Sequence, residues 1–354
     1  MLSKYLASET MLRRGDNSMK SCIAFFSAML ALWMTLSAAA HAETIVLAVP
    51  GPGTLAFLPV YLAKAIEADK AEGLELKLRY FNGGPVAMRD LMTNNSDFAA
   101  IGLPAIAAAH ADGMPVFAIG QLSNSAVFVF LLRSELKDQV HNIAQLKGRR
   151  IGTSSGTGTQ RSVVQMMEEY LLQRAGVEGN DVQFVSTGLN REARISALTS
   201  ATVDAIMGDE LFASELVAQG VAVRLADLYS PKTSNNLLGG PIVHAALATR
   251  EDIYKQRPAT VKKVQRMFDL ALQWISRHSA QEVVDKLAGQ PGFHADQNKL
   301  LVEILQRNQG MFPNRLAWNA QTVARTERFF HSMATNSQES HLSFADFVHD
   351  KPGD

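Results

Sequence analysis

Cysteine is almost absent from this chain of 354 residues, which holds only Cys22. A single thiol cannot form a disulfide within the chain, and it cannot supply the cysteine cluster of a zinc or iron–sulfur site. The nine histidines are scattered without the spacing of metal ligands, and we interpret them as surface or locally bonded side chains. No metal and no other cofactor is therefore expected.

Long runs of one charge are also missing. Lys plus Arg and Asp plus Glu each number 34, and no basic run is long enough to follow a phosphate backbone. Nucleic acid is therefore a poor candidate partner, and a small molecule is the better one. An apolar fraction of 47% with 19% charged residues is typical of a globular protein, with length for about two domains.

The N-terminal region contains an apolar run, residues 22–40, preceded by a lysine and closed by an A-x-A site at residues 40–42. This order of basic, apolar and small-residue regions is typical of a secretory signal. We expect residues 1–42 to be a cleaved signal peptide that releases the chain into the periplasm. The alternative is a membrane anchor, although polar residues interrupt the run. Met1 and Met19 are both possible starts.

From residue 43 onward, short apolar runs alternate with helical patterns, which predicts an α/β fold with largely parallel strands. The predicted strands cover residues 44–49, 74–80, 97–102, 115–121, 126–133, 150–154, 182–187, 203–208 and 241–250. The strand, glycine loop and helix that open the series recur at residue 150, so two similar lobes are expected.

The lobes are expected to be joined by two crossovers. Residues 126–133 form the natural first crossover strand, and residues 228–240, rich in turn residues, supply the second. Lobe 1 would then comprise residues 43–125 and 237–336, the latter including a helical C-terminal segment, and lobe 2 would comprise residues 126–236. Residues 337–354 are predicted to form a polar tail.

Five segments carry a family likeness. They are DFAAIGLPAIAAAHADGMPVFAIG (97–120), LKGRRIGTSSGTGTQ (146–160), LLQRAGVEGNDVQFVSTG (171–188), EARISALTSATVDAIMGDE (192–210) and LADL (225–228). In this order they resemble the periplasmic solute-binding proteins of ABC importers in the nitrate, sulfonate and taurine group, over roughly residues 44–287. The resemblance implies a two-lobed periplasmic binding protein type II fold with two crossover strands, which closes on its ligand. It also implies a monomer that serves an inner-membrane permease.

The loop at residues 154–160, SSGTGTQ, is not a P-loop, because Thr157 and Gly158 stand where that motif needs Gly and Lys. In the family this loop faces the cleft between the lobes, and free backbone N–H groups beside a helix N-terminus suit an anion. The alternative is that Ser155 or Thr157 only caps the helix.

Further ligand contacts are expected at loops that face the same cleft. The candidate ligand-binding residues are Gly53, Thr54, Phe57, Gly102, Pro104, Ser154, Ser155, Thr157, Arg191 and Glu210. Glu210 departs from the family pattern, which often has Pro after this Glu where this chain has Leu211, so its role is in doubt.

The favoured function is capture of a small polar or anionic organic solute, such as a sulfonate, taurine or nitrate, for an ABC permease, without catalysis. The first alternative is a biosynthetic enzyme with the same architecture, since fold alone does not settle function. The second is a periplasmic sensor subunit that presents its ligand to a receptor.

Overall fold

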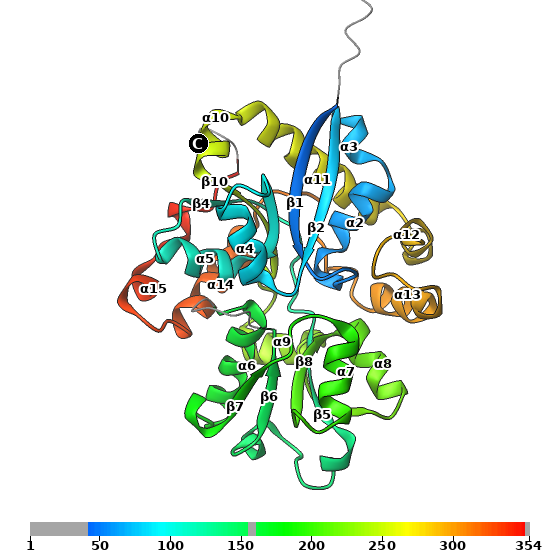
Figure 1. Ribbon diagram of the computed structural model, residues 1–354, viewed down its shortest axis with the longest axis vertical. Helices are drawn as coiled ribbons and strands as arrows, with labels where there is room; N and C mark the ends of the chain where they lie inside the picture. Colours follow the sequence, from blue (N-terminus) through cyan, green and yellow to red (C-terminus); the bar gives the residue numbers. More distant parts are fainter. Residues whose placement is uncertain (1–41, 155–160, 351–354) are drawn as a thin grey trace, which may run out of the picture. The chain divides into compact units, whose positions relative to one another are not determined.

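The computed structural model describes residues 42–154 and 161–350 of the chain. Residues from Glu43 onward form one compact unit built on two five-stranded sheets, each flanked by helices (Figure 1). We call each sheet with the helices that pack on it a lobe. The α/β class that the sequence predicts is confirmed.

The first sheet has the strand order β2-β1-β3-β10-β4. Its strands are β1 (Glu43–Pro50), β2 (Leu74–Phe81), β3 (Phe98–Gly102), β4 (Val116–Gln121) and β10 (Ala245–Arg250). Strand β1 pairs in parallel with β2 and β3, whereas β10 is antiparallel to β3 and β4. All five residues of β3 are buried, as expected of a strand covered on both faces.

The second sheet repeats this plan with the order β7-β6-β8-β5-β9. Its strands are β5 (Phe128–Arg133), β6 (Arg150–Thr153), β7 (Gln183–Ser186), β8 (Ala205–Asp209) and β9 (Ala222–Asp227). Strand β6 is parallel to β7 and β8, and β5 is antiparallel to β8 and β9. The expectation of largely parallel strands is thus wrong for one strand in each sheet, because β5 and β10 enter their sheets from the other lobe.

Helices connect the strands within each lobe and cover the sheets. They are α2 (Leu58–Ala65), α3 (Ala68–Ala71), α4 (Gly84–Met92), α5 (Leu103–Ala111), α6 (Val163–Arg174), α7 (Arg191–Thr199), α8 (Glu210–Ala218), α9 (Pro231–Leu238), α10 (Glu251–Gln256), α11 (Pro258–Arg277), α12 (Ala280–Leu287), α13 (Asn298–Arg307), α14 (Ala320–Ser332) and α15 (Ser337–His341). Short 3₁₀ turns are η1 (Leu55–Phe57), η2 (Ser134–Leu136), η3 (Ile143–Leu146), η4 (Gly179–Asp181), η5 (Ala295–Gln297) and η6 (Phe344–Asp346).

The chain passes between the two sheets twice, from β4 to β5 and from β9 to β10. The second passage contains helix α9, although its sequence is rich in turn residues. Pro231 occupies the first turn of α9, where its missing N–H costs nothing, and Gly239 ends the helix in the left-handed conformation. Turn residues at the two ends therefore delimit a helix here.

The segment predicted to be a polar tail, residues 337–354, is folded as far as the structure describes it. It forms α15 and η6, the side chains of Phe344 and Phe347 are buried, and Val348 forms a bridge to Ala118 of β4. Its two buried aromatic rings pack into the core of the first lobe beside Phe330. These rings explain why a stretch of mostly polar residues is ordered.

The C-terminal helices are divided between two sides of the first lobe. Helices α11 and α12 contact α2, while α14 and α15 contact α5 (Figure 1). Helix α13 also reaches the second lobe, where it contacts α8. The carboxyl ends of β1, β3, β6 and β8 are thereby left to form the walls of a cavity.

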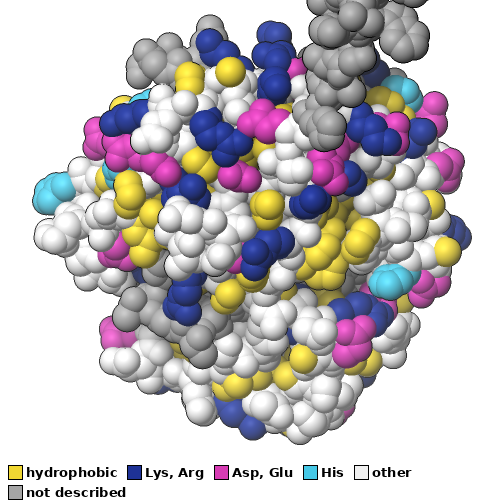
Figure 2. Space-filling view, turned by 45° about the horizontal axis from the view of Figure 1, so that its top comes forward, with side chains coloured by type: hydrophobic (Ala, Val, Ile, Leu, Met, Phe, Trp, Pro, Cys, Tyr) yellow, Lys and Arg dark blue, Asp and Glu magenta, His cyan; other side chains and the backbone are white. Residues whose placement is uncertain are grey.

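On the face shown in Figure 2, basic and acidic side chains are interspersed. Such a surface does not concentrate charge of one sign as a nucleic-acid groove does. Among the residues that the structure describes, no helix has the length and apolarity to cross a membrane, and no group of three or more His, Cys, Asp or Glu is placed to hold a metal ion.

Candidate functional site

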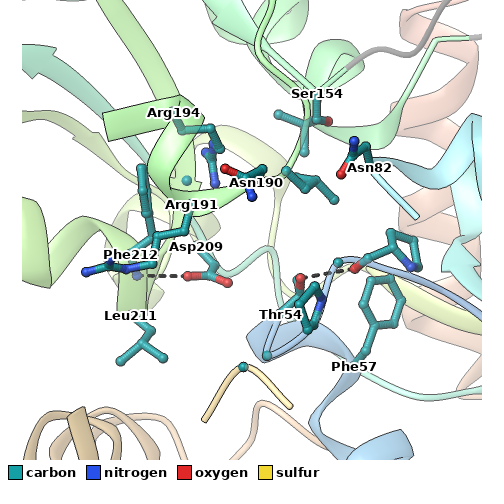
Figure 3. Close-up of a pocket in the computed structure, with 18 of the residues that line it drawn as sticks. Thr54, Phe57, Asn82, Ser154, Asn190, Arg191, Arg194, Asp209, Leu211 and Phe212 are labelled. Atoms are coloured by element: carbon teal, nitrogen blue, oxygen red, sulfur yellow. Dashed lines mark hydrogen bonds between the residues drawn. The ribbon is translucent and has the colours of Figure 1, made fainter. Parts of the chain in front are cut away.

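A cavity of about 390 Å³ lies where the carboxyl ends of the parallel strands of both sheets face each other. Residues 50–54 after β1, Ile101 and Gly102 of β3 and Ser154 after β6 contribute to its wall. Figure 3 shows Thr54 and Phe57 on one side, with Arg191, Arg194 and Asp209 facing them from the second lobe. The size is within the usual range for a small-molecule site.

The first-lobe wall is a tight loop between β1 and η1. The Gly51 N–H donates to the carbonyl of Phe81 at 2.7 Å, and the Thr54 hydroxyl donates to the carbonyl of Pro50 at 3.1 Å. Gly53 has φ of +72° and touches the backbone of Gly292 so closely that a Cβ would lie 2.2 Å from its carbonyl oxygen. Only glycine fits this contact, which fixes the loop against the segment before α13.

The second-lobe wall begins at the N-terminus of α7. Asn190 caps the helix by accepting the N–H of Ala193 at 2.8 Å, and Arg191 follows it. The Arg191 guanidinium is already paired: its Nε donates to Glu215 at 3.1 Å, a second nitrogen contacts the same carboxylate, and Glu192 lies 3.7 Å away. The sequence predicted Arg191 as a ligand-binding residue, and the structure pairs its guanidinium with a carboxylate from its own lobe.

Asp209 connects the two lobes. One carboxylate oxygen accepts the N–H of Phe212 at 3.0 Å and so caps α8, and the other accepts the N–H of Leu55 in η1 at 3.2 Å. A second bond across the cavity joins Gln297 to Glu215 at 3.0 Å. Burial raises the pKa of Asp209, and its two N–H bonds oppose that rise. These bonds hold the cavity in a closed arrangement.

Arg194 and Glu168 are two buried ionisable residues of the second lobe. Arg194 lines the cavity, donates to the carbonyl of Met207 and lies 4.1 Å above the ring of Phe212. Glu168 is fully buried, and neither of its oxygens has a hydrogen-bond partner in the described part of the chain. Burial raises its pKa to about 8, and the Thr153 hydroxyl, the Met207 backbone and the charge of Arg194 only partly oppose this rise. Neither residue is among the predicted site residues.

His244 precedes β10 and also lines the cavity. Its side chain is buried, its ring lies 4.5 Å from that of Phe128, and Nδ1 has no partner among the described residues. The interpretation of the histidines as surface or locally bonded is therefore wrong for His244. The run of apolar residues around it, PIVHAALA, was the available indication, because a strand with no polar neighbours buries its histidine.

Six predicted site residues line this cavity: Gly53, Thr54, Phe57, Gly102, Ser154 and Arg191. Ser155 and Thr157 lie outside the described residues. The alternative that one of these two caps the following helix is wrong, because α6 begins at Val163 and its cap is Ser162, which accepts the N–H of Gln165 at 3.1 Å.

Pro104 and Glu210 are not among the residues that line the cavity. Pro104 occupies the first turn of α5, where its side chain is buried. Glu210 is fully buried and accepts hydrogen bonds from Arg224 at 2.7 Å, Ser214 at 2.7 Å and Arg307 at 3.0 Å. Although burial opposes it, these bonds hold the pKa of Glu210 below its usual value. The cavity carboxylate at this strand end is instead the preceding residue, Asp209.

Replacing Glu210 by alanine should therefore lower stability without altering the cavity. The loss of a carboxylate that pairs two arginines should reduce the free energy of unfolding by about 2 kcal/mol, since both arginines are partly exposed and regain water. Urea unfolding measures this, with Glu303→Ala on the exposed face of α13 as control. A variant as stable as the parent would contradict the structural role.

The family model NMT1/THI5 like matches residues 55–282. YtlA of Bacillus subtilis, a proposed binding protein, is 23% identical over 235 residues, and the match covers 65% of this chain and 66% of that protein, slightly under two thirds of its length.

Two solved structures share the fold. The alkanesulfonate-binding protein SsuA from Xanthomonas axonopodis, bound to MOPS, is 18% identical with a TM-score of 0.64, covering 87% of this chain and 98% of its own. The periplasmic nitrate-binding protein NrtA from Synechocystis is 15% identical with a TM-score of 0.63, covering 87% and 86%. The expected two-lobed fold of periplasmic binding proteins is thus confirmed.

Proposed function

The chain belongs to the NMT1/THI5-like family, and on that premise we propose that it binds a small polar or anionic organic solute and delivers it to an ABC permease. The observation that carries the proposal is the cavity itself, whose walls are formed by strand ends of both lobes. The Asp209–Leu55 hydrogen bond connects the two lobes across it. Separation of the lobes would open such a cavity and closure would trap its contents. No chemical step is part of this proposal.

The proposed ligand contacts are the predicted residues that line the cavity. Thr54 and Ser154 supply hydroxyls, Arg191 supplies N–H donors, Phe57 supplies an aromatic ring, and Gly53 and Gly102 allow close backbone approach. We divide the chain accordingly into a first lobe of residues 43–125 and 237–336, on which residues 337–350 pack, and a second lobe of residues 126–236. The relatives named for binding sulfonate and nitrate support a solute of comparable size.

We also propose export to the periplasm by cleavage after Ala42. The support is the basic, apolar and A-x-A order of residues 1–42, most of which lies outside the described residues, together with the periplasmic description of NrtA. Cleavage there would remove Cys22, so the exported chain would hold no thiol.

Native mass spectrometry of the protein from the periplasmic fraction tests both parts of the proposal. We expect a chain that begins at Glu43 and carries a non-covalent adduct with the mass of a small organic molecule. Small-angle scattering should then show a smaller radius of gyration when that solute is added back to stripped protein. A chain that stays in the membrane fraction with residues 1–42 attached would contradict export. An unchanged radius at saturation would contradict closure.

A further inference from the structure

Hydrogen bonds that cross between the lobes are concentrated on one stretch of the chain, residues 297–339. Five of these bonds have their first-lobe partner there, in addition to the Asp209–Leu55 bond in the cavity wall. They join Gln297 to Glu215 at 3.0 Å, Tyr229 to the Ile304 carbonyl, Arg307 to Glu210 at 3.0 Å, and Arg161 both to the Met333 carbonyl at 2.8 Å and to Glu339 at 3.1 Å.

This stretch reaches the second lobe at two places. Helix α13 packs on α8, and the segment from Met333 to Glu339 contacts Arg161, which lies just before α6. Figure 1 shows α13 and α15 on opposite sides of the first lobe. The C-terminal part of the chain therefore holds the second lobe at two separate points.

The two contacts differ in how far water competes with them. The Arg307 side chain is 54% exposed, and Glu210 keeps its pairing with Arg224 when Arg307 leaves. An ion pair with so exposed a partner contributes little. The side chains of Arg161 and Glu339 are only 13% and 6% exposed, so salt and water screen their attraction much less.

The Arg161–Glu339 pair also has the further hydrogen bonds that a buried ion pair needs to be favourable. Arg161 donates to Glu169 of its own lobe at 2.9 Å as well as to Met333 and Glu339. The Glu339 carboxylate accepts the N–H of Thr335 at 2.6 Å and its hydroxyl at 3.0 Å. The guanidinium is thus held between one carboxylate from each lobe.

Arg161 is adjacent to the wall of the cavity. The next residue, Ser162, lines the cavity and its hydroxyl lies 3.0 Å from that of Ser154, which also lines it. Movement of this wall away from the first lobe would carry Arg161 with it and break its bonds to Met333 and Glu339. Because these bonds join protein atoms alone, they favour the closed arrangement before any solute enters.

We propose that residues 333–339, which we call the C-terminal clasp, hold the lobes closed through Arg161, so that the solute-free protein populates the closed arrangement. The clasp acts on the equilibrium between open and closed lobes and has no contact with the solute. A solute can leave only when the lobes separate, so the clasp also slows its release. Because the proposal concerns the solute-free protein, it can fail while the proposed solute binding stands.

Hydrogen exchange of the Leu55 amide reports separation of the lobes. This N–H donates across the lobes to Asp209, so it is protected when the lobes are closed and exchanges when they part. Protein that has been unfolded in urea, dialysed and refolded serves as the solute-free sample. Small-angle scattering of the same sample measures its radius of gyration.

Two variants weaken the clasp by small changes. Glu339→Gln removes the negative charge and keeps the size of the side chain, and Arg161→Lys keeps the positive charge but cannot bridge three acceptor oxygens. We expect each variant to exchange the Leu55 amide at least 5-fold faster than the parent and to have a larger radius of gyration. The amides of β1 should exchange at the parent's rate, because they bond within the first sheet. Urea unfolding shows that each variant is folded before its exchange is measured.

Asp346→Asn is the matched control, since it removes an exposed carboxylate from the same C-terminal segment. Arg307→Met should accelerate exchange less than Glu339→Gln does, because Arg307 is largely exposed. The proposal is overturned if Glu339→Gln and Arg161→Lys exchange the Leu55 amide no faster than the control. Faster exchange with an unchanged radius would mean local loosening of η1, and it would overturn the proposal too. An effect of Arg307→Met as large as that of Glu339→Gln would assign closure to α13 instead.

Discussion

Replacing Glu168 by glutamine should make the protein more stable at pH 8 and leave its stability at pH 4.5 nearly unchanged. The carboxyl is fully buried without a hydrogen-bond partner in the described part of the chain, and its pKa is about 8 instead of the usual 4.5. Below pH 4.5 the group is protonated in both folded and unfolded chains, so the parent and the variant should match.

The difference develops between these two pKa values. As pH rises from 4.5 to 8, the unfolded chain loses its proton and the folded chain keeps it. The free energy of unfolding of the parent should therefore fall by about 1.4 kcal/mol per pH unit relative to Glu168→Gln, reaching a constant difference on the order of 5 kcal/mol above pH 8.

Urea unfolding of parent and variant at intervals from pH 4.5 to 9 measures this difference. Taking the difference removes the contribution of other titrating groups such as His244, whose pKa is lowered in the folded chain. Glu303→Gln, a change at an exposed carboxylate, is the matched control. If the free energies of unfolding of parent and Glu168→Gln change with pH in parallel, Glu168 is ionised in the folded protein.

Replacing Gly53 by alanine should both destabilise the protein and weaken solute binding. The residue has φ of +72°, which costs an L side chain about 1 kcal/mol. Its new Cβ would also meet the Gly292 carbonyl oxygen at 2.2 Å, so two backbone segments of the cavity wall must separate. We expect a total loss of about 3 kcal/mol in the free energy of unfolding and solute affinity reduced at least 10-fold.

Gly73→Ala is a matched control for the backbone contribution alone. Gly73 has a similar φ of +67°, but a Cβ added there would have no other atom within 4 Å, and the residue is not part of the cavity. This variant should lose about 1 kcal/mol and bind normally. If Gly53→Ala loses no more stability than Gly73→Ala and also binds normally, the contact with Gly292 contributes neither to stability nor to solute binding.

The sequence predicted nine of the strands, most of them from apolar runs, because buried strands of an α/β fold are rich in apolar residues. Strand β2 was predicted from its alternating pattern, and its burial alternates. Strand β9, AVRLAD, was missed. Arg224 lies in the middle of this strand and forms an ion pair with Glu210. The local sequence is therefore too polar to indicate a strand, although β9 pairs with β5 along its length. A charge whose partner lies on another element cannot be interpreted from the local pattern.

The cavity was predictable where backbone conformation requires particular residues, as with the glycine loop at Gly53 and the helix start at Arg191. Glu168, Arg194 and His244 were missed because each depends on tertiary packing. Helical spacing did offer one indication, since Glu168 shares a face of α6 with the buried Leu171 and Leu172. The adjacent Glu169 hid this indication, because two neighbouring glutamates are typical of an exposed acidic helix face.

The backbone attachment of His244 has a consequence for the order of binding events. The His244 N–H donates to the carbonyl of Ser123 at 3.2 Å, and its carbonyl accepts the N–H of Leu103 at 3.1 Å. Because Leu103 begins α5 and Ser123 follows β4, His244 moves with the first lobe. Asp209, at the end of β8, moves with the second lobe. A solute that enters the open cavity on the side of His244 would meet the first lobe before the second. The association rate would then depend on the first lobe and the residence time on the second. Release would then require the second lobe to move away, while the first-lobe wall of the cavity keeps its arrangement.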